Sequence, residues 1–388
     1  MPRMESEVDR EMMRRAIRLA MRGRGAVEPN PMVGCIIAKD GLILGEGFHE
    51  TFGGPHAEPN ALTAAGPNAR GATAYVTLEP CCHLKKKTPP CVPALIKAGV
   101  ARVVVGCVDP NPMVAGKGLE QLRESGIEVD AEILGAECRQ LNAAFFKQME
   151  QRRPYVTLKW AQSENGKVAG AGGRRVQISN GASRRAVHGL RARSDAILVG
   201  IGTALLDDPL LTARDVACGR QPVRMIVDTD LRLPPTSQLA RTTGDGAVIL
   251  YCGESVYRQR HAAVAALESR GVEVCALREN PAEMRGKMGS LSLSRLLDDL
   301  GGRSMTHLLV DAGPTLAMSF LNENLADRVW VIRSEKRLEA EGRDAPHINW
   351  ETSGEMDLLG DRLREYLNPA GSVFYSLRKS ADFLAVEG

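Results

Sequence analysis

The stretch that decides the fold of the first half of the chain is HAE at residues 56–58, followed by EPCCH at 79–83 and TPPC at 88–91. One histidine and two cysteines at the starts of two successive helices can supply three zinc ligands, and we expect these to be His56, Cys81 and Cys91. Three protein ligands leave the fourth tetrahedral position for water, which is the arrangement of catalytic zinc sites. The sequence therefore predicts one catalytic Zn²⁺ per chain, with Cys82 as a bystander.

Glu58 lies two residues after His56, where the start of a helix can direct its carboxylate at the water on the metal. A carboxylate in that position can take a proton from the water and deliver it to a leaving amine. His-x-Glu followed by Pro-Cys is typical of zinc deaminases, although nine residues separate Cys81 from Cys91 here, where that pattern has two. The plain alternative is that His56 and Glu58 are ordinary polar residues of a helix start and the cysteines are idle thiols.

Helical and strand patterns alternate around this site, which predicts an α/β domain with helices on both faces of one sheet. The predicted helices cover residues 8–20, 56–65, 91–98, 119–125 and 135–149. The predicted strands cover residues 33–38, 42–48, 74–78 and 102–107. Asp40-Gly41 is a strong hairpin turn between the first two strands.

A domain boundary is expected at residues 151–154, because Pro154 cannot continue the preceding helix. A second α/β alternation follows, with predicted strands at residues 155–159, 196–199, 225–228, 248–251, 272–276 and 307–310. We therefore expect two domains, residues 1–150 and 154–388. The pattern does not assign residues 333–367, and two apolar runs at 373–377 and 383–386 could be closing strands.

Composition narrows the function classes. The 388 residues are 44% hydrophobic and 25% charged, with a net charge of +3, which is ordinary globular composition and predicts neither nucleic-acid nor membrane-surface binding. No apolar run approaches the roughly 20 residues that span a bilayer, and the N-terminus does not have the pattern of a signal peptide. A cytoplasmic protein is the default expectation. Nine cysteines, an odd number, suggest thiols or metal ligands rather than a disulfide scaffold.

Residues 10–330 resemble the bifunctional deaminase/reductase family of riboflavin biosynthesis. The matching strings are NPMVG at 30–34, GGPHAE at 53–58, TLEPC at 77–81, DPNP at 109–112, PYVTLK at 154–159, DDPLLT at 207–212 and GPTL at 313–316. The resemblance implies a three-layer α/β/α, cytidine-deaminase-like zinc domain followed by a dihydrofolate-reductase-like α/β domain that uses NADPH. It also implies a small-molecule substrate, a phosphoribosylaminopyrimidine, and a homo-oligomer formed through the reductase domain.

The same resemblance implies roles for individual residues. Glu58 would be the catalytic residue of the deaminase, whose substrate would contact Asn30, His49, His83, Lys87, Asp109 and Asn111. The reductase substrate would contact Arg191, Leu211, Arg214 and Asp311. The residues implied for NADPH are Ala161, Thr203, Asp207, Thr229, Gly313, Pro314, Thr315, Leu316, Ala317, Met318 and Ser319.

The sequence departs from the family pattern mainly in its second half. The usual Ser-Leu-Asp-Gly is Ser163-Glu164-Asn165-Gly166, the family glutamate is shortened to Asp311, and the pattern is unrecognisable from Arg333 onward. Arg175 and Gln177 stand where a serine and a tryptophan are usual. In the first half, three lysines at 85–87 leave open which one would meet the substrate phosphate.

Two alternatives follow. One is a deaminase whose degenerate second domain has no reductase activity and serves only as a scaffold for binding or oligomerisation. The other is a nucleic-acid deaminase, which would need a basic face with stacking aromatics, whereas only 4% of the residues are aromatic.

Overall fold

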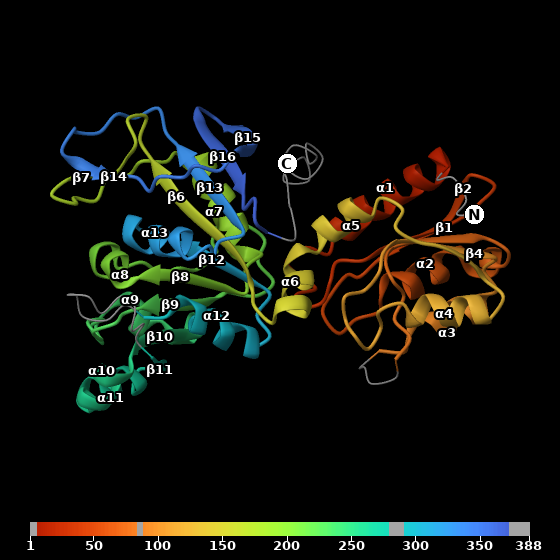
Figure 1. The fold of residues 1–388 in the computed structure, drawn as a ribbon, viewed down its shortest axis with the longest axis horizontal. Coiled ribbons are helices and arrows are strands. Elements are labelled where there is room, and N and C mark those ends of the chain that lie inside the picture. Colours follow the sequence, from red (N-terminus) through yellow and green to blue (C-terminus); the bar gives the residue numbers. More distant parts are fainter. Residues whose placement is uncertain (1–5, 84–87, 279–290, 372–388) are drawn as a thin grey trace. The chain divides into compact units, whose positions relative to one another are not determined.

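The computed structural model describes residues 6–83, 88–278 and 291–371, and the chain divides into two units, Met1–Gln151 and Arg152–Gly388 (Figure 1). The first unit is built on a five-stranded sheet in the order β2-β1-β3-β4-β5. Its strands are β1 (Gly34–Lys39), β2 (Leu42–Phe48), β3 (Thr73–Leu78), β4 (Arg102–Cys107) and β5 (Glu128–Asp130). The β1–β2 hairpin is antiparallel, whereas β3, β4 and β5 run parallel.

Helices cover both faces of this sheet, so the predicted three-layer α/β/α fold is confirmed (Figure 1). One face packs against α2 (Ala57–Ala65), α3 (Cys91–Ala98) and α4 (Lys117–Glu124) through a continuous apolar core. The other face is covered by α1 (Glu7–Met21) and α5 (Gly135–Leu141). Helix α1 lies so close to β1 that a Cβ on Gly34 would sit 2.0 Å from the Ala16 carbonyl oxygen. A 3₁₀ turn at Gly66–Ala69 follows α2.

The single helix predicted over residues 135–149 is wrong, because the chain forms two helices there, α5 and α6 (Ala143–Gln151). The break lies at Asn142, which is buried and has a non-helical φ of −115°. Its side-chain amide accepts a hydrogen bond from the Met32 N–H and donates one to the Met32 carbonyl, both at 2.8 Å. A distant backbone segment thus satisfies Asn142, an interaction that helical periodicity cannot reveal.

The second unit has a nine-stranded mixed sheet in the order β11-β10-β9-β8-β12-β6-β13-β16-β15. The first seven of these strands are parallel, and β16 and β15 add an antiparallel edge. The parallel strands are β6 (Tyr155–Gln162), β8 (Ala196–Gly200), β9 (Val223–Val227), β10 (Val248–Gly253), β11 (Val272–Leu277), β12 (His307–Asp311) and β13 (Arg328–Arg333).

Successive residues of the central strands enter opposite cores, as the two-residue period of a strand requires. In β8, Ile197 and Val199 face one core, and Ala196 and Leu198 face the other. The first core is closed by α7 (Gly181–Ala192), α8 (Ile201–Asp207), α9 (Gln238–Arg241) and α11 (His261–Glu268). The second is closed by α12 (Leu293–Gly302) and α13 (Pro314–Asn322). Two short elements, α10 (Glu254–Gln259) and a 3₁₀ turn at Thr243–Asp245, complete this unit.

Residues 333–367, which the sequence pattern left unassigned, form three strands: β14 (Gly342–Asp344), β15 (Thr352–Leu358) and β16 (Asp361–Leu367). β15 and β16 form the edge hairpin, whose polar residues pair across the strands, as in the 2.7 Å ion pair of Arg364 with Glu355. β14 instead pairs with β7 (Lys167–Ala171) in a separate two-stranded sheet. The closing strands predicted at 373–377 and 383–386 lie outside the described residues.

Candidate active sites

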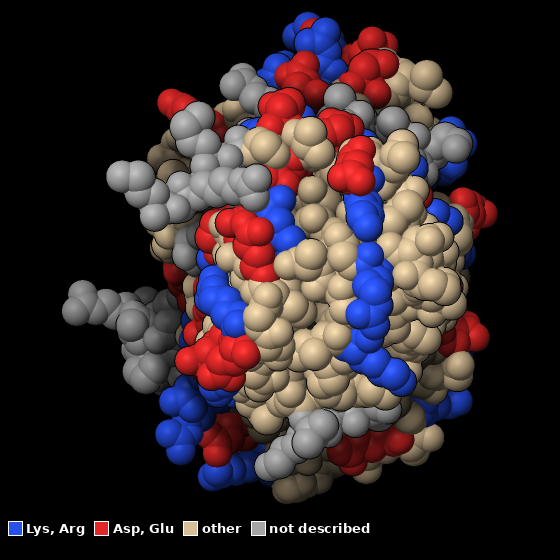
Figure 2. Space-filling model, turned by 90° about the vertical axis from the view of Figure 1, so that its right-hand side faces the viewer, with Lys and Arg blue, Asp and Glu red and all other residues tan. Residues whose placement is uncertain are grey.

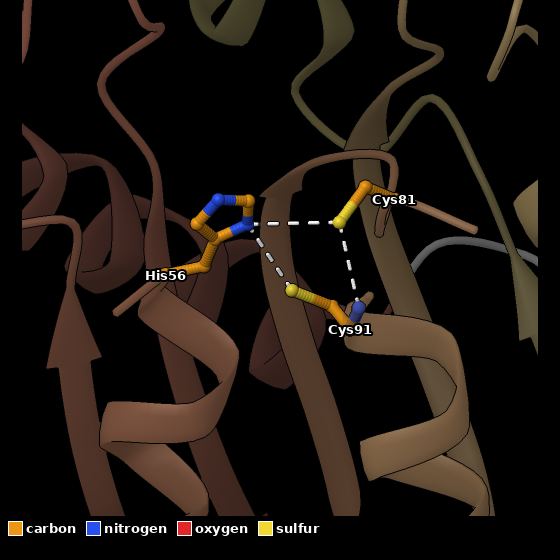
Figure 3. A group of neighbouring side chains, drawn as sticks. All are labelled: His56, Cys81 and Cys91. Carbon is orange, nitrogen blue, oxygen red and sulfur yellow. Dashed lines mark hydrogen bonds between the residues drawn. The ribbon is translucent and has the colours of Figure 1, made fainter. Parts of the chain in front are cut away.

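Three side chains of the first unit converge as a zinc site requires (Figure 3). His56 is the N-cap of α2, and Cys91 is the first residue of α3. The His56 Nδ1 atom lies 3.6 Å from the Cys81 Sγ atom and 3.3 Å from the Cys91 Sγ atom. Ligand atoms around a tetrahedral zinc ion are separated by roughly 3.5 Å, given metal–ligand bonds of about 2.0 to 2.3 Å. The donor set and its spacing therefore fit Zn²⁺.

The second nitrogen of the His56 ring fixes its orientation. Nε2 lies 3.1 Å from the Thr88 hydroxyl, which leaves Nδ1 to face the two cysteines. Such a partner on the far nitrogen is the usual way in which a ligating histidine is oriented. Backbone contacts reinforce the pair of cysteines, since the Cys91 N–H approaches the Cys81 sulfur at 3.4 Å.

Glu58 lies in the first turn of α2, beside the three ligands, and is almost completely buried. Its Oε2 atom has no hydrogen-bond partner, and burial raises the pKa of this carboxyl group. A buried carboxyl with an unsatisfied oxygen next to a metal site is suited to exchange a proton with a small polar molecule bound there.

Two residues expected at the pyrimidine lie beside the same site. The imidazole rings of His49 and His56 meet edge to face, with centroids 5.3 Å apart. His49 is oriented by the Pro55 carbonyl oxygen, 2.9 Å from Nδ1, and its Nε2 lies 3.3 Å from the Asn30 amide nitrogen. The structure thus brings Asn30 and His49 together with His56.

The loop after β4 is held next to the zinc cysteines by Glu79, a residue to which sequence analysis gave no role. The buried Glu79 carboxylate accepts backbone hydrogen bonds from Asp109 at 3.2 Å, Gly116 at 2.8 Å and Gly118 at 2.9 Å. Asp109 in turn accepts the Asn111 N–H at 2.8 Å. Glu79 follows β3 and immediately precedes Pro80-Cys81, so one short segment supplies both a zinc ligand and the anchor of this loop.

His83 and Lys87 are the other two residues expected to contact the deaminase substrate. His83 is partly exposed and lies two residues after Cys81. Lys87 lies outside the described residues, as do the neighbouring lysines 85 and 86.

The second unit contains a large cavity of about 1180 Å³ at the carboxyl ends of its central strands. It is lined by every residue expected there from the sequence except Ala317 and Met318; Ala317 is fully buried in the apolar core beneath α13. Among the residues that the structure describes, three aspartates line the cavity: Asp207, Asp208 and Asp311. The lining cations are more numerous: Lys159, Arg175, Arg184, Arg191, Arg214, Arg232 and Arg343. This excess of cations suits phosphorylated ligands.

Asp311 organises one wall of the cavity. Its carboxylate lies 3.1 Å from the Lys159 Nζ atom and 2.8 Å from an Arg191 Nη atom. Burial alone would raise the pKa of Asp311, but the two cations outweigh it and lower the pKa to about 2. The Arg191 Nε atom is buried without a hydrogen-bond partner, which leaves this guanidinium able to bind a further acceptor.

Lys159 and His188 also line the cavity, although sequence analysis gave neither a role. The signal in the sequence that could have identified Lys159 is that it is the single cation in the largely apolar run that forms β6. Burial, together with Arg191 and Arg214, lowers the pKa of His188, so its imidazole is neutral near pH 7.

The opposite wall has the features of a dinucleotide site. Gly313 is the N-cap of α13 and provides no side-chain cap, and Pro314 at the first helical position has no N–H, so the first-turn N–H groups available to an anion are those that follow Pro314. A Cβ on Gly313 would lie 3.3 Å from the Thr203 hydroxyl on α8, so glycine keeps the space between the two helix starts open. Asp207, at the end of α8, forms a 3.0 Å ion pair with Arg175. The size of the cavity, its cations and this helix start fit NADPH.

The segments that depart from the family pattern contact each other. Asn165 donates to the Leu338 carbonyl at 2.9 Å and accepts the Leu338 N–H at 3.0 Å. Lys336 donates to the Gln177 carbonyl at 2.7 Å, and β7 pairs with β14. We call these two segments, residues 163–178 and 334–345, the β7–β14 module.

Two family models match the chain. Residues 6–107 match the cytidine and deoxycytidylate deaminase zinc-binding region, and residues 154–334 match the RibD C-terminal domain. The riboflavin biosynthesis protein RibD of Aquifex aeolicus is 41% identical over 330 residues, 85% of this chain and 88% of that protein. RibD of Escherichia coli is 40% identical over 352 residues, 86% and 90% of the two chains.

Solved structures agree. Acinetobacter baumannii RibD superposes with a TM-score of 0.82 at 36% identity, covering 94% of this chain and 99% of that one. A Thermotoga maritima structure, described as a diaminohydroxyphosphoribosylaminopyrimidine deaminase/5-amino-6-(5-phosphoribosylamino)uracil reductase, superposes with a TM-score of 0.78 at 34% identity, covering 93% and 99%.

The chain belongs to the RibD family. It has both the zinc-binding deaminase domain and the NADPH-dependent reductase domain of that family, so the bifunctional enzyme of riboflavin biosynthesis is favoured over a deaminase with a degenerate companion domain. The β14–β16 region that departs from the pattern lies beyond the residues that the RibD C-terminal domain model matches.

Two further observations concern the helices and the surface of this member of the RibD family. Within the part of the chain that the structure describes, no helix is both long and apolar enough to cross a membrane. On the face drawn in Figure 2, Lys and Arg side chains lie among Asp and Glu side chains, and uncharged residues fill most of the area. That face lacks the broad basic surface that binds nucleic acids.

Proposed function

We propose that this enzyme catalyses two consecutive steps on one substrate, a pyrimidine that bears a ribosylamino 5-phosphate. The domain of residues 1–150 replaces the ring 2-amino group with oxygen from water and releases ammonia. The domain of residues 154–388 then reduces the ribosyl group to a ribityl chain with NADPH. The observation on which this proposal chiefly rests is the convergence of His56, Cys81 and Cys91 beside the buried, unsatisfied carboxyl of Glu58.

In the deaminase domain, His56, Cys81 and Cys91 hold the zinc ion, which when bound supplies a Lewis acid that lowers the pKa of a coordinated water to about 7. Glu58 takes a proton from the attacking water and delivers it to the departing amino group. His49 and Asn30 bind the pyrimidine, which is supported by their contact with each other and with His56. The remaining substrate contacts are assigned to His83, Lys87, Asp109 and Asn111.

In the reductase domain, Arg191 and Arg214 bind the phosphate or ribose of the deaminated intermediate, together with Leu211 and Asp311. The unpartnered Nε atom of Arg191 supports this assignment. NADPH lies along the wall formed by Ala161, Thr203, Asp207, Thr229 and the start of α13. The open first turn of α13 and the excess of cations in the cavity support this assignment.

One experiment tests both steps. The purified protein is incubated with the diaminopyrimidine phosphoribosylamine, with and without NADPH, and the products are identified by mass. We expect the deaminated ribosyl product without NADPH and the ribityl product with it. Deamination without any NADPH oxidation would contradict the reductase step, and no ammonia release from zinc-loaded protein would contradict the deaminase step.

We further propose a cytoplasmic, homo-oligomeric enzyme that associates through the reductase domain. None of the nine cysteines forms a disulfide bond, which is compatible with a reducing compartment. Light scattering on the intact protein measures the oligomeric state, and a monomer at micromolar concentration would contradict this part of the proposal.

A further inference from the structure

Arg343 is a cation in the reductase cavity that lies beyond the residues matched by the RibD C-terminal domain, 154–334. It belongs to β14, and its side chain is exposed. Pairing with β7 and the reciprocal bonds between Asn165 and Leu338 hold β14 in its position at the cavity. The position of Arg343 is therefore set by the β7–β14 module.

The guanidinium of Arg343 reaches the start of α13. One of its Nη atoms donates to the Thr315 hydroxyl at 3.0 Å, and Thr315 is the second residue of the helix. Within the described part of the chain, no carboxylate lies within ion-pair distance of Arg343. Two positive features, a guanidinium and the N-terminal end of a helix dipole, thus lie together without a counter-charge.

Such an arrangement is unfavourable in isolation, because like charges repel, and it becomes favourable when an anion lies between them. A phosphate suits both partners, since it accepts hydrogen bonds from the first N–H groups of a helix and pairs with the planar fork of an arginine. The fork also contacts Thr315, one of the residues assigned to NADPH above.

We propose that Arg343 binds a phosphate group of NADPH at the first turn of α13, which makes the β7–β14 module part of the cofactor site. This inference rests on the proposed reductase function. It adds a cofactor-binding residue from a segment outside the family match. The phosphate is either the pyrophosphate, which NADPH shares with NADH, or the 2′-phosphate, which NADH lacks.

The test measures equilibrium binding of NADPH and of NADH to the full-length protein by calorimetry, without the pyrimidine substrate. Wild type is compared with Arg343→Ala and Arg343→Lys. The matched control is Arg337→Ala, which removes an exposed arginine of the same segment that pairs with Glu164 at 3.4 Å and does not line the cavity. Because Arg343 is at the surface, none of these variants removes core packing.

We expect Arg343→Ala to weaken NADPH binding about 10-fold, the low end for a hydrogen bond to a charged group at an exposed site. Arg343→Lys should recover part of the loss, and the difference should shrink as salt increases. An equal loss for NADPH and NADH identifies the pyrophosphate, and a loss for NADPH alone identifies the 2′-phosphate. Unchanged binding of both dinucleotides to Arg343→Ala, or an equal loss in Arg337→Ala, overturns the inference.

The result also separates this inference from the proposed function. Wild-type protein that binds no NADPH would contradict the reductase function itself. Wild-type protein that binds NADPH as tightly as Arg343→Ala does would leave that function intact and remove only the role of Arg343.

Discussion

Asp311 and Arg191 form an ion pair of 2.8 Å across the reductase cavity, from the end of β12 to the last turn of α7. This pair holds a guanidinium whose Nε atom still has no hydrogen-bond partner. Asp311 also bonds Lys159, the residue directly opposite it on β6. The first two predictions concern this cluster.

Arg191→Ala should raise KM for the deaminated intermediate, because it removes a charge-assisted contact to phosphate or ribose worth about 1.5 to 3 kcal/mol. Ammonia release by the first domain should be unchanged. The measurement supplies the deaminated intermediate directly and follows NADPH absorbance. Arg185→Ala is the control, an exposed arginine on the same helix that does not line the cavity. A KM equal to that of wild type would remove Arg191 from the substrate site.

Asp311→Asn should destabilise the reductase domain by about 3 kcal/mol near neutral pH, because it leaves two largely buried cations without their carboxylate. The pKa of Asp311 is lowered to about 2, so its stabilising charge is fully present above about pH 4 and is lost as the pH falls towards 2. The difference in unfolding free energy between wild type and variant should therefore shrink over that interval. A difference that stays constant from pH 6 to pH 2 would mean that the carboxylate charge is not its cause.

Cys91→Ser should lose most of the zinc, because one of three protein ligands is removed from a buried site. Metal analysis of the purified variant is the measurement. Cys82→Ser is the matched control and should keep one zinc ion per chain. If Cys82→Ser loses the metal and Cys91→Ser retains it, the ligand assignment is wrong.

Glu58→Gln should keep zinc and fold while deamination falls by about 10²- to 10⁴-fold, the usual effect of losing a general acid–base group. The amide has nearly the same shape but cannot shuttle a proton. Ammonia release, zinc content and thermal unfolding are measured on the same preparation. Near-normal ammonia release would assign the proton transfer to another group.

Glu79→Gln should raise KM of the deaminase more than it lowers kcat, with zinc retained. The Glu79 carboxylate accepts hydrogen bonds from three close backbone N–H groups. In the glutamine one carboxylate oxygen is replaced by an NH₂ group, which cannot accept a hydrogen bond, so at least one of these N–H groups loses its acceptor. The loop of Asp109 and Asn111 should therefore lose its fixed position. Unchanged KM with a lowered melting temperature would indicate a structural role only.

The sequence predicted the zinc site well because its chemistry is local. His56 and Glu58 lie within one turn of one helix, and Pro90 precedes the first residue of α3, so short motifs define their geometry. Glu79 belongs to the same motif, but its partners are backbone groups from residue 109 onward, and no side-chain pattern identifies them. Lys159 was missed for a related reason, since its partner Asp311 is 152 residues away.

The fold was predictable where periodicity is strong. The central strands of the second domain are nearly all apolar, and the structure has strands at each of those runs. Strands β15 and β16 were not predictable, because they are rich in polar residues, and buried ones such as Asp361 and Glu365 are satisfied by distant side chains. β16 pairs with β13, and β15 pairs in turn with β16. Asn142 shows the converse case, in which one distant hydrogen-bonding partner breaks a helix that periodicity predicts to be continuous.

The reciprocal bonds between Asn165 and Leu338 restrict how the two halves of the β7–β14 module can diverge. Replacing residues 163–166 alone with the family's Ser-Leu-Asp-Gly would place a carboxylate at position 165, which can accept the Leu338 N–H but cannot donate to the Leu338 carbonyl. A relative's 334–345 segment that follows a different backbone course would leave the Asn165 amide without both of these main-chain partners. Chimaeras with a related enzyme should therefore fold well only when both segments are exchanged together. We therefore expect residues 163–178 and 334–345 to change together among related enzymes, although more than 150 residues separate the two segments in the chain.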